Sequence, residues 1–137
     1  PKPNDFLRCA EKISGLELDW YLLDWTQSTM TIDYAISSVE EDSKKTKILL
    51  RRIGQMGMPI DIKIFLKSGK SIMYNIPLTK MRGSKPVKNF TLLDSWSWAK
   101  PEYDFYIDLS KSDISKIMID PEGKMADVNR TNNVVLF

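Results

Sequence analysis

The chain has 137 residues, of which 42% are hydrophobic and 28% charged. These values are typical of one folded domain and differ from the low hydrophobicity of disordered chains. A net charge of +2 gives no reason to expect a polyanionic partner, and no apolar run approaches the ~20 residues needed to span a bilayer. We therefore predict no nucleic-acid partner and no membrane span.

The chain contains no histidine and a single cysteine, Cys9. Histidine is the commonest general base in enzymes and a common zinc ligand. This composition excludes Ser-His-Asp and Cys-His catalysis, cysteine-cluster metal sites and an internal disulfide. We predict that the chain has no catalytic, cofactor-binding or metal-ligating residue of its own, and that Cys9 is a small apolar residue buried along the first helix.

Residues 1–28 predict two short helices, because apolar side chains recur there at spacings of three and four. In the first helix they are Phe6, Cys9, Ala10 and Ile13, and in the second they are Leu18, Tyr21, Leu22 and Trp25. Asn4 or Asp5 can cap the start of the first helix, and Gly15 can end it. After Gln27 the spacing changes to two, which indicates that strands follow the helices.

Between residues 29 and 137, apolar and polar residues alternate in short segments that predict about seven or eight strands. The segments are residues 30–37, 48–53, 60–66, 72–76, 89–93, 103–109, 117–119 and 134–137. Ser68-Gly69 predicts a tight hairpin turn, and the run from Glu40 to Lys45 predicts a broader turn. We predict a mainly β fold: an immunoglobulin-like antiparallel β-sandwich with a short N-terminal helical segment.

Two acidic segments have both a chemical and a structural interpretation. Residues 120–133 are dense in oxygen ligands for calcium, but they lack the spacing of an EF-hand loop. Asp and Asn also fold turns by hydrogen-bonding their own backbone, and we favour that role here. The run Glu40-Glu41-Asp42 lacks the cleft and the raised pKa that catalytic carboxylates need, so we expect a solvated turn.

Basic residues gather at positions 44–52 and 80–88, with aromatic residues nearby that could stack on nucleic-acid bases. Acidic neighbours dilute both clusters, and a folded surface ordinarily carries this much charge. A nucleic-acid-binding β domain is therefore the least favoured function.

The chain has four tryptophans, Trp20, Trp25, Trp96 and Trp98, and such large side chains are usually buried or lie at interfaces. The two short helices offer more apolar surface than one sheet edge can cover. We therefore predict an interface with polypeptide outside this chain. Its candidate residues are Phe6, Trp20, Tyr21 and Trp25.

Stretches spread over nearly the whole chain carry a resemblance to a known family. They are Pro3-Asn4-Asp5-Phe6, Glu11 to Trp20 with Trp25, Asp33-Tyr34-Ala35-Ile36, Arg52 to Pro59, Leu66 to Pro77, Trp96 to Tyr103, and Ile119 to Asn133. Their order and spacing resemble the end of the catalytic helical domain and the following β-sandwich of aminopeptidase N-like (gluzincin) zinc metallopeptidases, most closely the Bacteroidetes type. Tyr21 departs from the pattern, which usually has Phe there.

The resemblance implies that residues 1–28 end a catalytic domain and that residues 29–137 form an accessory β-sandwich. Family members hold zinc through His-Glu-x-x-His and a downstream Glu, and bind the substrate amino terminus through Gly-x-Met-Glu-Asn. Neither motif is present, so no family catalytic residue is carried over to this chain. Because the chain starts at Pro1 without a methionine, we expect the catalytic polypeptide to precede it.

The implied function is a non-catalytic region of a zinc-dependent aminopeptidase that packs against the catalytic domain, supports it and helps to wall its cleft. Zinc and peptide substrate then belong to the parent enzyme, and the catalytic domain is the partner. Because bacterial family members of this type are often exported, the resemblance also implies a periplasmic or extracellular location.

A second function, of a different class, is a free-standing immunoglobulin-like module that binds carbohydrate or protein. This hypothesis predicts that Trp96 and Trp98 lie side by side on one flat, solvent-facing surface. Burial of both side chains in the sandwich interior would contradict it.

Overall fold

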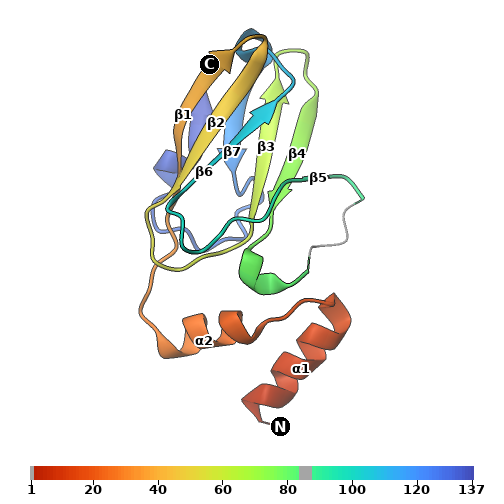
Figure 1. Ribbon diagram of the computed structural model, residues 1–137, viewed down its shortest axis with the longest axis vertical. Coiled ribbons are helices and arrows are strands. Elements are labelled where there is room, and N and C mark those ends of the chain that lie inside the picture. Colours follow the sequence, from red (N-terminus) through yellow and green to blue (C-terminus); the bar gives the residue numbers. More distant parts are fainter. Residues whose placement is uncertain (1, 84–87) are drawn as a thin grey trace.

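The computed structural model describes residues 2–83 and 88–137, which form two α-helices followed by eight strands in two sheets (Figure 1). Helices α1 (Pro3–Ser14) and α2 (Asp19–Gln27) lie at one end of the sheets, and the C-terminus lies at the other. One sheet has the order β1-β2-β6, formed by Tyr34–Asp42, Lys45–Arg52 and Glu102–Ile107. The other has the order β5-β4-β3-β7-β8, formed by Thr91–Leu92, Ser71–Ile76, Ile60–Leu66, Ile114–Ile119 and Val134–Leu136.

The sheet orders confirm the predicted β-sandwich. The chain crosses between the sheets after β2, before β6 and after β6, so that β1-β2-β6 faces β4-β3-β7-β8. This is the connectivity of an immunoglobulin-like sandwich in which the fourth strand pairs with the third. The pairing of β5 with β4 is parallel, unlike the antiparallel pairing of the other described strands. β5 covers only Thr91–Leu92, within the predicted segment 89–93.

The core lies between the two sheets, where alternate residues of each strand are buried. In β3, Ile60, Ile62 and Ile64 are at most 1% exposed, while Asp61 and Lys63 between them are partly exposed. Because side chains along a strand alternate between its two faces, the period-two pattern of the sequence directs these isoleucines inward. The predicted β3–β4 hairpin is confirmed, with its strands antiparallel.

The β1–β2 hairpin differs from the predicted broad turn. Residues 40–42 belong to β1, and only Ser43 and Lys44 form the turn, with φ angles of 52° and 74°. Two consecutive left-handed residues give a tight turn whose twist matches that of the strands. Glu40 lies opposite Lys47 in the register, and such opposite charges across a hairpin stabilise an acidic residue in a strand.

Helix α1 ends as predicted, since Gly15 follows it with φ 70°. At its start, however, Lys2 is the cap residue, and the Lys2 backbone N–H donates to the Asp5 carboxylate at 2.8 Å. Cys9 is exposed, so the prediction of a buried thiol is wrong. The physical reason is that α1 does not lay its apolar stripe on the sandwich and buries only Leu7.

Tyr34 joins several distant segments at the end of the sandwich near the helices. Its side chain is fully buried, and its hydroxyl accepts from the Met58 N–H at 2.9 Å and donates to the Met58 carbonyl at 3.1 Å. The Tyr34 backbone N–H donates to the Asp127 carboxylate at 2.9 Å. The Trp96 ring packs edge-on against the Tyr34 ring, with 5.4 Å between centroids.

Residues 120–133 use their carboxylates to hold their own loop. The two oxygens of Asp120 accept the backbone N–H groups of Lys124 and Met125, each at 2.9 Å. Asp127 accepts from the Asn129 N–H at 2.8 Å, besides the N–H of Tyr34. These carboxylates therefore hydrogen-bond the backbone of their own loop, as the structural interpretation of residues 120–133 predicts.

We expect Tyr34→Phe to lower the free energy of unfolding by about 1–3 kcal/mol, because both polar groups of Met58 lose the hydroxyl they bond in the interior. Urea unfolding measures the change. Tyr106→Phe is the matched control: Tyr106 is 48% exposed, so its loss should change stability by less than about 0.5 kcal/mol. Equal stability of the two variants would contradict the role given to the buried hydroxyl.

Tyrosine burial also predicts a loss of stability in alkali. Burial raises the pKa of Tyr103 from 10.0 to about 12, and the carboxylates of Asp94 and Asp104 add to the rise. Burial likewise raises the pKa of Tyr34 and of Tyr74 above 10.0. The unfolded chain therefore releases these protons first, so the tyrosine contribution is complete below pH 10 and is lost as pH rises towards about 12.

Urea unfolding at a series of pH values across this window measures the loss. Tyr103→Phe should make the free energy of unfolding fall less steeply with pH, whereas Tyr106→Phe should leave the slope unchanged. A slope that Tyr103→Phe does not alter would contradict the assignment to Tyr103.

Candidate functional site

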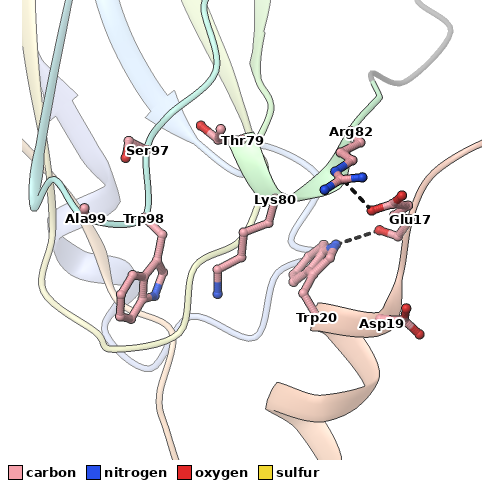
Figure 2. Close-up of a pocket in the computed structure, with 9 residues that line it drawn as sticks. All are labelled: Glu17, Asp19, Trp20, Thr79, Lys80, Arg82, Ser97, Trp98 and Ala99. Atoms are coloured by element: carbon pink, nitrogen blue, oxygen red, sulfur yellow. Dashed lines mark hydrogen bonds and ion pairs between the residues drawn. The ribbon is translucent and has the colours of Figure 1, made fainter.

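A groove of about 710 Å³ lies where the helical segment meets the sandwich (Figure 2). Its volume falls in the range of ordinary ligand sites. One wall comes from the start of α2 and the residues before it, and the other from the short helix η1 (Thr79–Met81) and the loop before β6. The lining residues are Glu17, Asp19, Trp20, Thr79, Lys80, Arg82, Ser97, Trp98 and Ala99.

The sandwich wall is built around the exposed ring of Trp98. The Lys80 ammonium lies 4.9 Å from the centroid of this ring, and the Arg52 guanidinium lies 5.7 Å from it. Such cation–aromatic contacts are worth about 0.5–1 kcal/mol at exposed sites. Arg52 also donates to the Trp98 carbonyl at 2.7 Å and to the Gln55 carbonyl at 3.2 Å, so its head group is fixed beside the ring.

Backbone hydrogen bonds hold the Trp98 loop against η1. The Trp96 N–H donates to the Pro77 carbonyl at 2.8 Å, and the Thr79 N–H donates to the Trp96 carbonyl at 3.3 Å. The turn after Trp96, closed by a bond of 3.1 Å from the Lys100 N–H to the Ser97 carbonyl, directs Trp98 outward. This arrangement is what brings Lys80 and Trp98 together.

The helical wall is fixed by Glu17. Its backbone N–H donates to the Met81 carbonyl at 3.2 Å, and its own carbonyl accepts the Trp20 indole N–H at 2.7 Å. Its carboxylate lies 3.6 Å from Arg82 in an exposed ion pair, which contributes at most about 1 kcal/mol. Figure 2 shows the Lys80 side chain extending between the indoles of Trp98 and Trp20.

The groove is lined by groups that can bind a ligand. Aromatic faces, cations and carboxylates line it, but within the described ranges neither hydroxyl, of Thr79 or Ser97, hydrogen-bonds a carboxylate that would activate it. Among residues 2–83 and 88–137, no three Asp, Glu or Cys side chains gather closely enough to hold a metal ion.

The predicted interface residues come from both helices and differ in exposure. Trp20 lines the groove and is half-buried, while Tyr21 and Trp25 are 41% and 42% exposed. The three rings of α2 lie in a row, with 5.8 Å between successive centroids. Phe6 on α1 is 75% exposed. The interface stays a prediction, and these exposed side chains remain its candidate contacts.

The predicted platform of Trp96 and Trp98 is wrong. Trp96 is 3% exposed and belongs to the core, where its indole N–H donates to the Lys100 carbonyl at 2.9 Å. Trp98 is 49% exposed. Of this pair only Trp98 remains on the surface, flanked by two cations, so the predicted surface that presents both rings is not formed.

Sequence reasoning missed the groove as a site. Its walls come from residues 17–20, 79–82 and 97–99, which are far apart in the chain and share no spacing pattern. The basic cluster at 80–88 includes Lys80 and Arg82 but does not reveal that they face the helical segment.

None of the helices in the described part of the chain is long and apolar enough to cross a membrane. In comparisons with protein-family models, with curated proteins and with solved structures, nothing matches this chain. The resemblance to aminopeptidases therefore stays a prediction that rests on the residues quoted for it.

We expect the chain to bind no zinc stoichiometrically and to cleave no aminoacyl anilide, because a zinc site needs three converging protein ligands and the chain has no imidazole to supply. Elemental analysis after dialysis against micromolar zinc measures the first property, and a chromogenic assay measures the second. One tightly held zinc per chain would contradict this expectation.

Proposed function

We propose that this chain is a non-catalytic β-sandwich region of a zinc-dependent aminopeptidase, and that α1 and α2 dock onto the catalytic domain of the same enzyme. The enzyme class rests on the resemblance of the sequence motifs. The docking rests on one structural observation: both helices present apolar side chains to solvent.

The stripe on α1 consists of Phe6, Cys9 and Ile13, which share one face at helical spacing. Phe6 is 75% and Ile13 82% exposed, whereas a surface helix ordinarily turns such a stripe towards a core. On α2, Tyr21 and Trp25 are one turn apart and also exposed. A partner that covers these faces removes a substantial apolar area from water, which is the main driving force for association.

Helix length supports the same conclusion. α1 has 12 residues and α2 has 9, and isolated helices shorter than ~12–15 residues are marginal in water. Helices of this length obtain their stability from packing of an apolar face. Among their described residues, α1 buries only Leu7 and α2 only Asp24, so a partner would supply the missing packing.

The coding sequence upstream of Pro1 gives the first test. The proposal requires a His-Glu-x-x-His motif and a downstream Glu within a few hundred residues before Pro1, and their absence would contradict the enzyme class.

Phe6→Asp tests the docking. In the 137-residue chain it should change the free energy of unfolding by less than about 0.5 kcal/mol, because Phe6 is exposed. In the parent protein it should destabilise the junction by about 1.5–3 kcal/mol, the value for burying a phenylalanine side chain. Thermal unfolding of both proteins measures the difference.

Leu136→Asp is the matched control, because Leu136 is 73% exposed and lies in β8, the last strand, away from the helices (Figure 1). Leu136→Asp should leave the stability of the 137-residue chain and that of the parent protein unchanged. If Phe6→Asp affects the chain and the parent protein by the same amount, α1 does not dock and the proposal fails on that point.

A further inference from the structure

A hollow of about 510 Å³ lies on the outer face of the five-stranded sheet, the face that points away from β1-β2-β6. Its volume falls in the range of ordinary ligand sites. Ile62 and Ile64 of β3 point into the core, so Lys63 and Phe65, which alternate with them, point to the outer face. We call this site the outer-face hollow; its other apolar lining residues are Met73, Phe90, Met118 and Pro121.

The lining of the outer-face hollow is rich in apolar side chains. In the register, Lys63 lies opposite Met73 on β4 and opposite Met118 on β7. The outer face of an antiparallel sandwich ordinarily carries polar side chains, whereas this one presents two methionines beside Phe65. Methionine side chains are flexible and adapt to the shape of a ligand. The apolar body of a small molecule can therefore pack against this face.

Two lysines of the outer-face hollow have no acidic partner. The ammonium groups of Lys63 and Lys116 lie 5.0 Å and 4.3 Å from the centroid of the same Phe65 ring. Within the part of the chain that the structure describes, neither lysine forms an ion pair with a carboxylate. By contrast Lys47, which also lies near an aromatic ring, has the Asp104 carboxylate at 3.3 Å. The hollow therefore holds two positive charges without a neighbouring negative charge to offset them.

The one carboxylate among the described lining residues is that of Glu122, which is exposed and forms an ion pair with Lys124 in the turn after β7. Its charge is thus offset outside the lysine pair. Because the lysine side chain is flexible, the ammonium groups of Lys63 and Lys116 can both turn from the Phe65 ring to one carboxylate. A bound anion would also remove the repulsion between the two like charges.

The backbone around the lysine pair favours a small molecule over an extended peptide. β3 pairs on both sides, with β4 and β7, and β7 pairs on both sides, with β3 and β8. An extended peptide gains much of its affinity by adding to a free strand edge, and the two strands that carry the lysines offer none. A small organic anion needs only the side chains.

We propose that the outer-face hollow binds a small amphipathic carboxylate, with the carboxylate at the ammonium groups of Lys63 and Lys116 and the apolar body against Met73, Phe90 and Met118. This inference goes beyond the function proposed above and does not depend on it, because no residue of α1 or α2 lines the hollow.

The test uses 4-phenylbutyrate, its neutral analogue 4-phenylbutanamide, its cationic analogue 4-phenylbutylamine, and acetate. Chemical-shift titration of the isotope-labelled 137-residue chain by NMR at low salt gives the affinities, and the shifted amides give the location. 4-Phenylbutyrate should half-saturate the chain at about millimolar concentration, as expected for a ligand of this size. It should bind about tenfold more tightly than the amide, as expected for two exposed ion pairs. The amine and acetate should bind most weakly.

Variants assign the binding to the outer-face hollow. Lys63→Gln and Lys116→Gln should each lower the preference for the acid over the amide about threefold, and the double variant should abolish it. Met118→Ala should weaken binding of the acid and of the amide alike, about threefold, because the apolar body loses a contact. All three side chains are partly exposed, so these variants should fold. Lys47→Gln is the matched control, since Lys47 also lies near an aromatic ring but on the other sheet, and it should change neither affinity.

Four results would overturn the proposal: equal affinity for the acid and the amide, a preference for the acid that survives in the double lysine variant, shifts confined to amides away from the hollow, or no binding of 4-phenylbutyrate at tens of millimolar. Tighter binding of N-acetylglycyl-phenylalanine would also overturn it, by assigning the hollow to the carboxyl end of a polypeptide. Binding of inorganic phosphate as tight as that of 4-phenylbutyrate would do the same, because the apolar body would then contribute nothing.

Discussion

The buried hydroxyl of Tyr34 is the interaction on which the end of the sandwich near the helices depends. It bonds both polar groups of the Met58 backbone, so the loop between β2 and β3 is fixed to β1. The backbone N–H of the same residue holds Asp127, which fixes the loop between β7 and β8. A buried network of this kind specifies one arrangement, because each unpaired member would lose a hydrogen bond without gaining one from water.

The sandwich wall of the groove is positioned by contacts with this Tyr34 network. Tyr34 packs against Trp96, and Trp96 in turn bonds the backbone on both sides of Leu78. The turn that follows Trp96 points Trp98 outward beside Lys80. The position of the exposed Trp98 ring is therefore set by the buried ring of Trp96, two residues earlier. Lys80 and Arg52 lie outside the core, but the ring beside which they lie is positioned by it.

The strands could be predicted from the sequence because their alternation is local: Ile60, Ile62 and Ile64 follow it directly. Residues 40–42 could not be placed, since their position in β1 depends on lysines across the hairpin that single-sequence propensity does not weigh. Burial of Trp96 and exposure of Trp98 likewise depend on contacts with Tyr34 and Arg52, which are distant in sequence. Helical spacing predicted that Cys9 is buried, and this was wrong. The spacing identifies an apolar face of α1, but it does not tell whether another part of this chain covers that face.

The two helices differ in how firmly the sandwich holds them. Before α2, Glu17 bonds Met81, and Gly83 comes so close that an added Cβ would lie 3.1 Å from the Leu16 side chain. After α2, an added Cβ at Gly54 would lie 2.3 Å from the Thr31 carbonyl, so the chain is tightly packed there as well. α2 is thus held at both ends, whereas among the described residues of α1 only Leu7 is buried. Because α1 also carries the most exposed apolar side chains of the two helices, it is the element whose position a partner would determine most strongly.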